Sequence, residues 1–312
     1  MQDSKKDPTA INIIVALRIA QRIKSTYIRY KSLQEYKNFI DRFEEYLKLK
    51  ELDDLKISEF TKAHAIRYLD DVLLTRKVNA QTRNNYMRAM KALFYTLAER
   101  DYIEVNPFAA IKTLKETQKK RRTFTYSEKQ TIIQYIKQDN KELLLAVCLC
   151  YYCAIRPAEL RRLKVGNLDL KIGLIQMDGS QTKNKENATI TIPKVLLPLL
   201  NSYHLNSYPK SWYLFGAGAL KPAANPCGRD TISKKHKRVI KNLHLYGFLK
   251  DVEGKTFYSW KDTAARDLIE QGLNIMDLKQ HFRHKELATT QRYLQAYGGV
   301  NDSIRDMENK IF

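Results

Sequence analysis

A charged run without apolar periodicity divides this chain of 312 residues into two differently patterned parts. The run extends from Lys112 to Arg122, reads KTLKETQKKRR, and comes shortly after Asn106-Pro107. Such a segment has no apolar face to bury, so we predict a linker that follows a phosphate backbone. Apolar residues recur at helical spacing before the run, whereas helical and strand patterns are mixed after it. We therefore expect a helical domain followed by a mixed α/β domain.

The residues before the run predict a small bundle of helices. Three apolar stripes over 33–47, 66–73 and 86–97 each have the spacing of a helix with one buried face. A further amphipathic helix begins near Ile11, and its apolar stretch to Leu17 is too short to cross a membrane. Arg83, Arg88 and Lys91 belong to the helix of the third stripe. They either contact DNA or form an ordinary solvated surface.

The residues after the run predict helices around one β-hairpin, so the fold class is mainly α with a small β-hairpin. Strand alternation covers 173–177 and 188–193. The helical segments are 127–136, 143–153, 230–243 and the residues from Trp260 onward, with a break at Gly272. The expected domains are an N-terminal helical extension (1–27), a helical domain (28–112), a basic linker (113–125) and a mixed α/β domain (126–312) with a tail (294–312).

The charge of the chain favours a polyanionic partner. Lys and Arg number 55 against 34 acidic residues, which gives a net charge of +21. Such a field attracts phosphates and releases counterions, so nucleic acid is the expected partner and an anionic membrane surface is the weaker alternative. A hydrophobic content of 44% excludes a mostly disordered protein. No convincing cleavage site for a signal peptide follows the first helix, so we expect a cytoplasmic, nucleoid-associated protein.

The four cysteines are expected to be core residues. Cys148, Cys150 and Cys153 lie in an apolar helical segment, and Cys227 is isolated in the sequence. The Cys150-x-x-Cys153 pair lacks the second pair or nearby histidine that would complete a zinc site. The sequence therefore predicts packing rather than metal ligation at these positions. No metal and no other cofactor are expected.

Two polar motifs of the second part suit phosphate chemistry. Tyr293 closes the segment HKELATTQRY, which begins at His284, so a phenol that can attack phosphorus follows an imidazole that can bind a phosphate oxygen. Arg156 follows a predicted helix and precedes Glu159 by three residues. A guanidinium stays charged and can span two non-bridging oxygens, and Glu159 is expected to orient it or to cap the next helix. An ordinary surface ion pair is the alternative for Arg156.

These motifs resemble the boxes of the tyrosine recombinases, the phage-integrase-like site-specific DNA recombinases, over about residues 28–300. The resemblance implies a SAM-like core-binding domain and a catalytic domain that form a C-shaped clamp on DNA. It implies that Tyr293 attacks a phosphodiester, displaces a 5′ hydroxyl and forms a 3′-phosphotyrosyl link without metal or nucleotide. It also implies a hairpin lysine that protonates the leaving oxygen. Lys183 is the best match, with Lys185 close behind.

The second arginine box departs from the family pattern. Most members have His-x-x-Arg where this chain has Tyr258-Ser-Trp-Lys261, which resembles variants among integrases of mobile elements from Bacteroides-type bacteria. A lysine cannot make the bidentate fork of an arginine. Either Lys261 serves as a point charge, or Arg266 supplies the second guanidinium, or catalysis is impaired. The usual Gly-His pair reads Arg283-His284, and Arg283 adds a cation near the scissile phosphate.

The resemblance also implies partners. One is double-stranded DNA, and the others are accessory DNA-bending or directionality proteins. The protein is expected to be a monomer in solution and to form a homotetramer on two DNA sites. The expected function is integration or excision of a mobile element. A type IB topoisomerase and a catalytically impaired DNA-binding protein are the alternatives. The linker cations expected on the phosphate backbone are Lys119, Lys120, Arg121 and Arg122.

Overall fold

The computed structural model describes residues 8–117, 122–182 and 184–297. Backbone contacts divide the chain into two compact units, Met1–Lys119 and Lys120–Phe312. Each unit has its own apolar core. The division falls within the charged run, because that run contributes no residue to either core. Residues 118–121 of the run lie outside the described residues.

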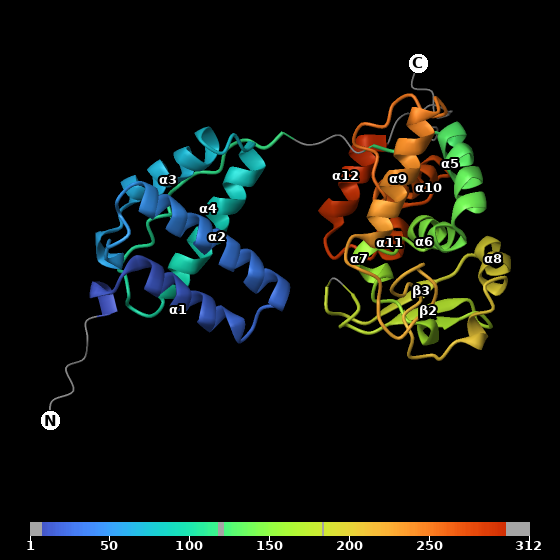
Figure 1. Cartoon of the computed structure of the whole chain (residues 1–312), viewed down its shortest axis with the longest axis horizontal. Coiled ribbons are helices and arrows are strands. Elements are labelled where there is room, and N and C mark those ends of the chain that lie inside the picture. The colour runs from blue at the N-terminus through green and yellow to red at the C-terminus, as the bar shows by residue number, and fades with distance from the viewer. Residues whose placement is uncertain (1–7, 118–121, 183, 298–312) are drawn as a thin grey trace, which may run out of the picture. The chain divides into compact units, whose positions relative to one another are not determined.

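The first unit is a bundle of helices (Figure 1). Its α-helices are α1 (Ile13–Ser25), α2 (Tyr30–Leu49), α3 (Lys62–Leu74) and α4 (Ala80–Ala98). The three predicted stripes correspond to α2, α3 and α4, so these predictions are confirmed. Helix α1, expected within a separate extension, packs against α2 and α4 and buries Ile13 and Leu17 completely. This helix therefore shares the core of the first unit.

The second unit combines helices with one small sheet. Its α-helices are α5 (Tyr126–Asp139), α6 (Lys141–Tyr152), α7 (Pro157–Leu160), α8 (Leu197–Asn201), α9 (Thr231–Leu245), α10 (Ser259–Glu270), α11 (Ile275–Phe282) and α12 (Leu287–Tyr297). The sheet lies at one end of this unit, beside α7 and α8, in Figure 1. In the described ranges 8–117, 122–182 and 184–297, no helix has the length and apolar character needed to cross a membrane.

The sheet contains the predicted hairpin and one additional strand. Its antiparallel order is β1 (Leu168–Asp169), β2 (Leu174–Met177) and β3 (Ala188–Thr191). Ile175 pairs with Ile190, and both side chains enter the core. The hairpin is confirmed. Strand β1 escaped prediction because two residues are too few to show a period-2 pattern.

Helix α10 lies inside the second unit, where it packs against α6, α11 and α12. Most of its first eight residues are buried, including the charged Lys261 and Asp262. Cys150 and Cys153 at the end of α6 are also fully buried, with no disulfide to each other. The prediction of core cysteines is confirmed for Cys150, Cys153 and Cys227, whereas Cys148 is partly buried against the same core. Burial raises the pKa of both thiols to about 12, so they stay protonated at neutral pH.

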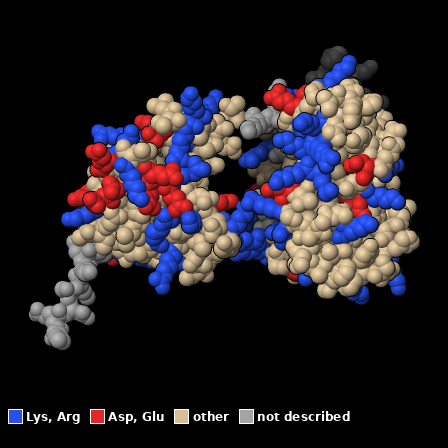
Figure 2. Space-filling view, in the orientation of Figure 1, with Lys and Arg blue, Asp and Glu red and all other residues tan. Residues whose placement is uncertain are grey.

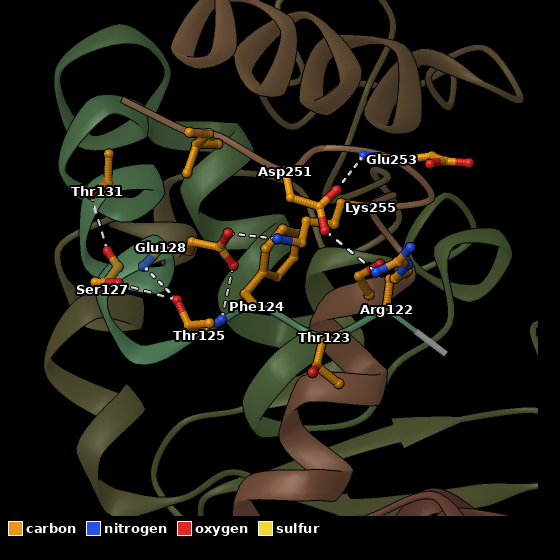
Figure 3. Close-up of polar contacts among 12 residues, drawn as sticks. Arg122, Thr123, Phe124, Thr125, Ser127, Glu128, Thr131, Asp251, Glu253 and Lys255 are labelled. Carbon is orange, nitrogen blue, oxygen red and sulfur yellow. Dashed lines mark hydrogen bonds and ion pairs between the residues drawn. The ribbon is translucent and has the colours of Figure 1, made fainter. Parts of the chain in front are cut away.

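Polar contacts anchor the segment that leads into α5 (Figure 3). Thr125 and Glu128 form a capping box, in which the Thr125 N–H donates to Glu128 Oε2 at 2.9 Å. Lys255 donates to the other oxygen of Glu128 at 2.5 Å. Arg122, the last residue of the charged run, lies 3.4 Å from Asp251. The last residue of the charged run therefore contacts the loop that contains Asp251 in the second unit.

Candidate active site

One cleft of the second unit gathers segments that are distant in the sequence. It has a volume of about 290 Å³. The loop after α6 contributes Arg156, and the turn after α11 contributes Arg283, His284 and Lys285. The remaining lining residues are Glu159, Gln280 and part of the β2–β3 hairpin, namely Thr182, Asn184, Glu186, Asn187, Ala188 and Thr189. Lys183, the expected hairpin lysine, lies outside the described residues, and Lys185 is exposed on the same loop.

Arg156 and Glu159 form the predicted pair. Arg156 is the residue before α7, and its backbone N–H donates to Glu159 Oε2 at 3.0 Å. The Nη1 of Arg156 donates to Glu159 Oε1 at 2.9 Å. Glu159 therefore both caps the helix and orients the guanidinium, as the spacing predicted. The Glu159 side chain is 0% exposed, whereas the Arg156 side chain is 15% exposed in the cleft.

A second guanidinium binds the same carboxylate. Arg283 ends α11 in the left-handed conformation with φ 53°, and its Nη2 donates to Glu159 Oε2 at 2.9 Å and to the Ala154 carbonyl at 3.0 Å. Burial acts to raise the pKa of Glu159, but Arg283 and Arg156 outweigh it and hold that pKa below its ordinary value. Glu159 is therefore ionised at neutral pH and neutralises part of the charge of the two arginines.

His284 and Tyr293 lie together as the sequence motif predicted. Their rings stack with centroids 5.7 Å apart and an interplanar angle of 15°. The Nδ1 of His284 hydrogen-bonds the Thr290 hydroxyl at 2.9 Å, which fixes the orientation of the imidazole. Tyr293, on α12, is only 1% exposed and packs against Phe282. The phenol is thus adjacent to the cleft residue His284 but is itself buried in an apolar cluster.

Lys261 does not present its charge to the cleft. Its side chain is 0% exposed, and its ammonium donates to the Ala154 carbonyl and lies 4.4 Å from the centre of the Phe282 ring. Burial, together with the nearby Arg156 and Arg283, holds the pKa of Lys261 well below its ordinary value. Helix α10 directs this side chain into the fold, so Lys261 is not among the residues that line the cleft, and its contact with a phosphate stays a prediction.

The remaining residues of the second arginine box also lie away from this cleft. Arg266 donates to the Thr123 hydroxyl at 3.0 Å, to the Phe124 carbonyl at 2.9 Å and to Asp267 at 2.7 Å. These bonds tie α10 to the segment before α5, and Arg266 is not among the residues that line the cleft. Tyr258 is partly exposed and lines a different cleft beside α9.

The three cations of α4 are engaged within the first unit. Arg83 is buried and donates to the Lys112 carbonyl at 3.1 Å. Arg88, half exposed, pairs with Glu116 at 2.7 Å, and Lys91 donates to the Ala109 carbonyl at 2.6 Å. They hold the following segment against α4. Arg83 therefore acts inside the fold, whereas Arg88 is half exposed, and DNA contact by these three cations stays a prediction. Of the linker cations, Lys119, Lys120 and Arg121 lie outside the described residues.

Helix α9 has an exposed basic face that was not among the predicted DNA-binding residues. This helix buries Ile232, Val239, Ile240 and Leu243 and contains no acidic residue. Figure 2 shows Lys and Arg gathered on the surface around it. The signal was present as cations on the face opposite the apolar stripe. The exposed α9 cations are Lys234, Lys237, Arg238 and Lys241.

Comparisons with known proteins identify the family of this chain. The model of the phage integrase family matches residues 122–298, and that of its N-terminal SAM-like domain matches residues 17–104. A tyrosine recombinase of Pseudothermotoga lettingae is 22% identical over 262 residues, which are 83% of this chain and 85% of that protein. The tyrosine recombinase XerA of Pyrococcus furiosus is 27% identical over 172 residues, 55% of this chain and 56% of that protein.

Two solved structures have the same fold. The Tn1549 transposon integrase in complex with circular intermediate DNA matches with a TM-score of 0.72 at 16% identity, over 96% of this chain and 100% of that chain. A lambda integrase dimer bound to a COC′ core site matches with a TM-score of 0.72 at 18% identity, over 97% and 82%. These matches confirm the predicted pair of a SAM-like and a catalytic domain. The chain belongs to the phage integrase family and is a tyrosine-type site-specific DNA recombinase.

Proposed function

We propose that this recombinase cuts and rejoins DNA through a covalent bond between Tyr293 and a 3′ phosphate. The observation that supports this most is the cleft that holds Arg156, Arg283 and His284 beside the hairpin, with Tyr293 stacked on the histidine. Two guanidiniums and an imidazole in one cleft can stabilise the charge that develops on a phosphorus with five oxygen ligands. The relatives are named recombinases and integrases, which favours strand exchange over the topoisomerase alternative.

The proposed step conserves bond energy. The Tyr293 oxygen attacks the phosphorus, an O–P bond forms, and the bond from phosphorus to the 5′ oxygen breaks. The phenol gives its proton to water as it attacks, and the departing 5′ oxygen gains a proton, for which Lys183 is the proposed donor. A 5′ hydroxyl of the partner strand then reverses the step and releases Tyr293. No nucleotide is consumed.

The buried phenol adds a conformational requirement. Tyr293 packs against Phe282, Leu278 and the alanines of α10 in one apolar cluster. Moving such a side chain into water costs about 1.5–3 kcal/mol. Contact with DNA or with a neighbouring subunit must supply this free energy, so α12 moves before cleavage. This arrangement protects DNA from attack by an unassembled protein.

DNA is the proposed partner of the basic surfaces. The four exposed cations of α9 and the linker cations provide the phosphate contacts, and the net charge of +21 steers the association. The lambda integrase has been solved as a tetramer bound to a Holliday junction. We propose the same assembly here, as a tetramer on two DNA sites that acts in integration or excision of a mobile element with accessory proteins.

A nicked suicide substrate tests the chemistry. Cleavage near the nick releases a short strand that diffuses away, so the covalent intermediate accumulates and migrates as a protein–DNA adduct. Tyr293→Phe removes one hydroxyl and should abolish the adduct while DNA binding persists. Binding without any adduct from the parental protein would instead support the alternative of a catalytically impaired DNA-binding protein. Relaxation of supercoiled DNA without exchange of partner strands would support the topoisomerase alternative.

A further inference from the structure

The site contains one guanidinium whose hydrogen bonds are incomplete. Arg283 uses only Nη2, which contacts Glu159 and the Ala154 carbonyl. Its Nε and Nη1 are both buried, and neither finds an acceptor among the residues that the structure describes. A buried donor without an acceptor costs about 1–3 kcal/mol, and more when the group is charged. An acceptor supplied by a ligand would remove this cost.

Arg156 and Arg283 are arranged as a symmetric pair around Glu159. Each approaches a different oxygen of this carboxylate at 2.9 Å, and each side chain is 15% exposed. Both line the cleft together with His284. A phosphodiester has two non-bridging oxygens, and two planar forks can bind them at once. The pair therefore offers two forks and two positive charges, where a single arginine offers one of each.

We propose that Arg283 is the second guanidinium that binds the scissile phosphate, and that Lys261 is a positioning residue. This inference rests on the proposed function. Arg283 occupies the position at which most family members have glycine, and Lys261 occupies the position at which most have arginine. The guanidinium has thus moved from α10 to the end of α11. Arg266 is committed to Asp267 and to the segment before α5, so it does not compete for this role.

The Ala154 carbonyl connects the two residues. Ala154 adopts a left-handed conformation with φ 49°, which is unfavourable for a residue with a side chain. Its carbonyl accepts from both Lys261 and Arg283. Lys261 thereby fixes the backbone just before Arg156 and the acceptor on which Arg283 docks. The lysine acts on the phosphate only through these two arginines.

Removal of the Arg283 side chain tests the proposal without disturbing the backbone. Arg283→Gly suits the left-handed conformation at this position, and Arg283→Lys is the matched control that keeps the charge but loses the fork. On the suicide substrate both should cleave slower than the parental protein, Arg283→Gly by about 10²–10³-fold, the loss typical of one transition-state donor. DNA affinity should change little, whereas the loss of one partner of the buried Glu159 should lower the stability of Arg283→Gly. Cleavage is therefore compared at a temperature at which thermal unfolding curves show every variant to be folded.

A neutral substrate separates contact from positioning. A methylphosphonate at the scissile position replaces one charged oxygen with a methyl group, so a guanidinium that stabilises charge has less to contribute. The defect of Arg283→Gly should shrink at least tenfold on this substrate, whereas the defect of Lys261→Met should be the same on both. Equal defects of Arg283→Gly on both substrates, or cleavage of the phosphate at the parental rate, would overturn the proposal. The proposed function would stand in either case, because it depends on the adduct of the parental protein at Tyr293.

Discussion

Replacing Glu159 by glutamine should destabilise the second unit strongly. The carboxylate is fully buried and accepts two guanidinium N–H groups at 2.9 Å and one backbone N–H at 3.0 Å. Glu159→Gln keeps the volume and one acceptor oxygen, but it leaves Arg156 and Arg283 without their shared counter-charge. Removing one partner of a buried ion pair costs about 3–5 kcal/mol. The retained acceptor places the expected loss near the lower limit of about 3 kcal/mol.

The loss should depend on pH in a defined direction. The pKa of Glu159 is lowered in the fold, so the unfolded chain binds the proton more tightly than the folded chain does. Its stabilisation is therefore fully present above the unfolded pKa of about 4.3 and is lost as the pH falls through the folded value. The difference in stability between parental protein and variant should be constant from about pH 6 to 8, where Glu159 is ionised in both the folded and the unfolded chain, and it should shrink in acid.

Urea unfolding followed by tryptophan fluorescence measures this loss in the relevant unit. Both tryptophans, Trp212 and Trp260, belong to the second unit. A loss of about 3 kcal/mol corresponds to a fall in Tm of about 6–12 °C for a unit of this size. Glu270→Gln is the control, because Glu270 is 59% exposed and lies 3.4 Å from Arg266, a pairing worth about 0–1 kcal/mol. A loss no larger than that of the control at pH 7 would refute the reasoning.

Three further predictions concern the nucleophile, the DNA and the buried lysine. Tyr293→Phe should unfold within about 1.5 kcal/mol of the parental protein while losing the adduct, and any adduct formed by it would identify another nucleophile. Replacing the four exposed cations of α9 by glutamine should reduce the salt dependence of DNA binding by about 0.9 log unit for each lost contact, and an unchanged slope would place α9 off the DNA. The pKa of Lys261 is lowered in the fold, so unfolded chains bind its proton up to about pH 10.4 and stability should rise with pH toward that value. Lys261→Met should remove this rise in urea titrations at pH 7 and 9.5, and equal rises in both proteins would show that the folded lysine keeps its proton.

Local sequence patterns predicted the elements and the short-range contacts well. The apolar stripes located α2, α3 and α4, and the alternation located β2 and β3. The spacing of Arg156 and Glu159 predicted both of their contacts, because residues three apart on a helical turn are neighbours. The spacing of His284 and Tyr293 likewise predicted that the imidazole and the phenol lie near one another, and their rings stack.

Contacts between distant segments were beyond such patterns. The sequence placed Lys261 on a helix, but only the packing of α10 between α6 and α12 decides that its side chain points inward. Arg283 donates to the carbonyl of Ala154, a residue that is distant in the sequence and adopts an uncommon backbone conformation. The contacts of the α4 cations were also not predictable, because Arg83 and Arg88 bind partners 29 and 28 residues later in the sequence.

If both arginines bind the scissile phosphate as proposed, the carboxylate of Glu159 that they share also affects the release of the bound DNA. Two guanidiniums and one ionised Glu159 carry a net charge of +1, which matches the single negative charge of a phosphodiester. Without Glu159 the arginine pair would hold both the intact strand and the phosphotyrosyl link more tightly, and binding both equally would add nothing to the rate of exchange. In the proposed mechanism, Glu159 thus keeps binding of the ground-state phosphodiester weak, while both guanidiniums remain in place to bind the more highly charged transition state.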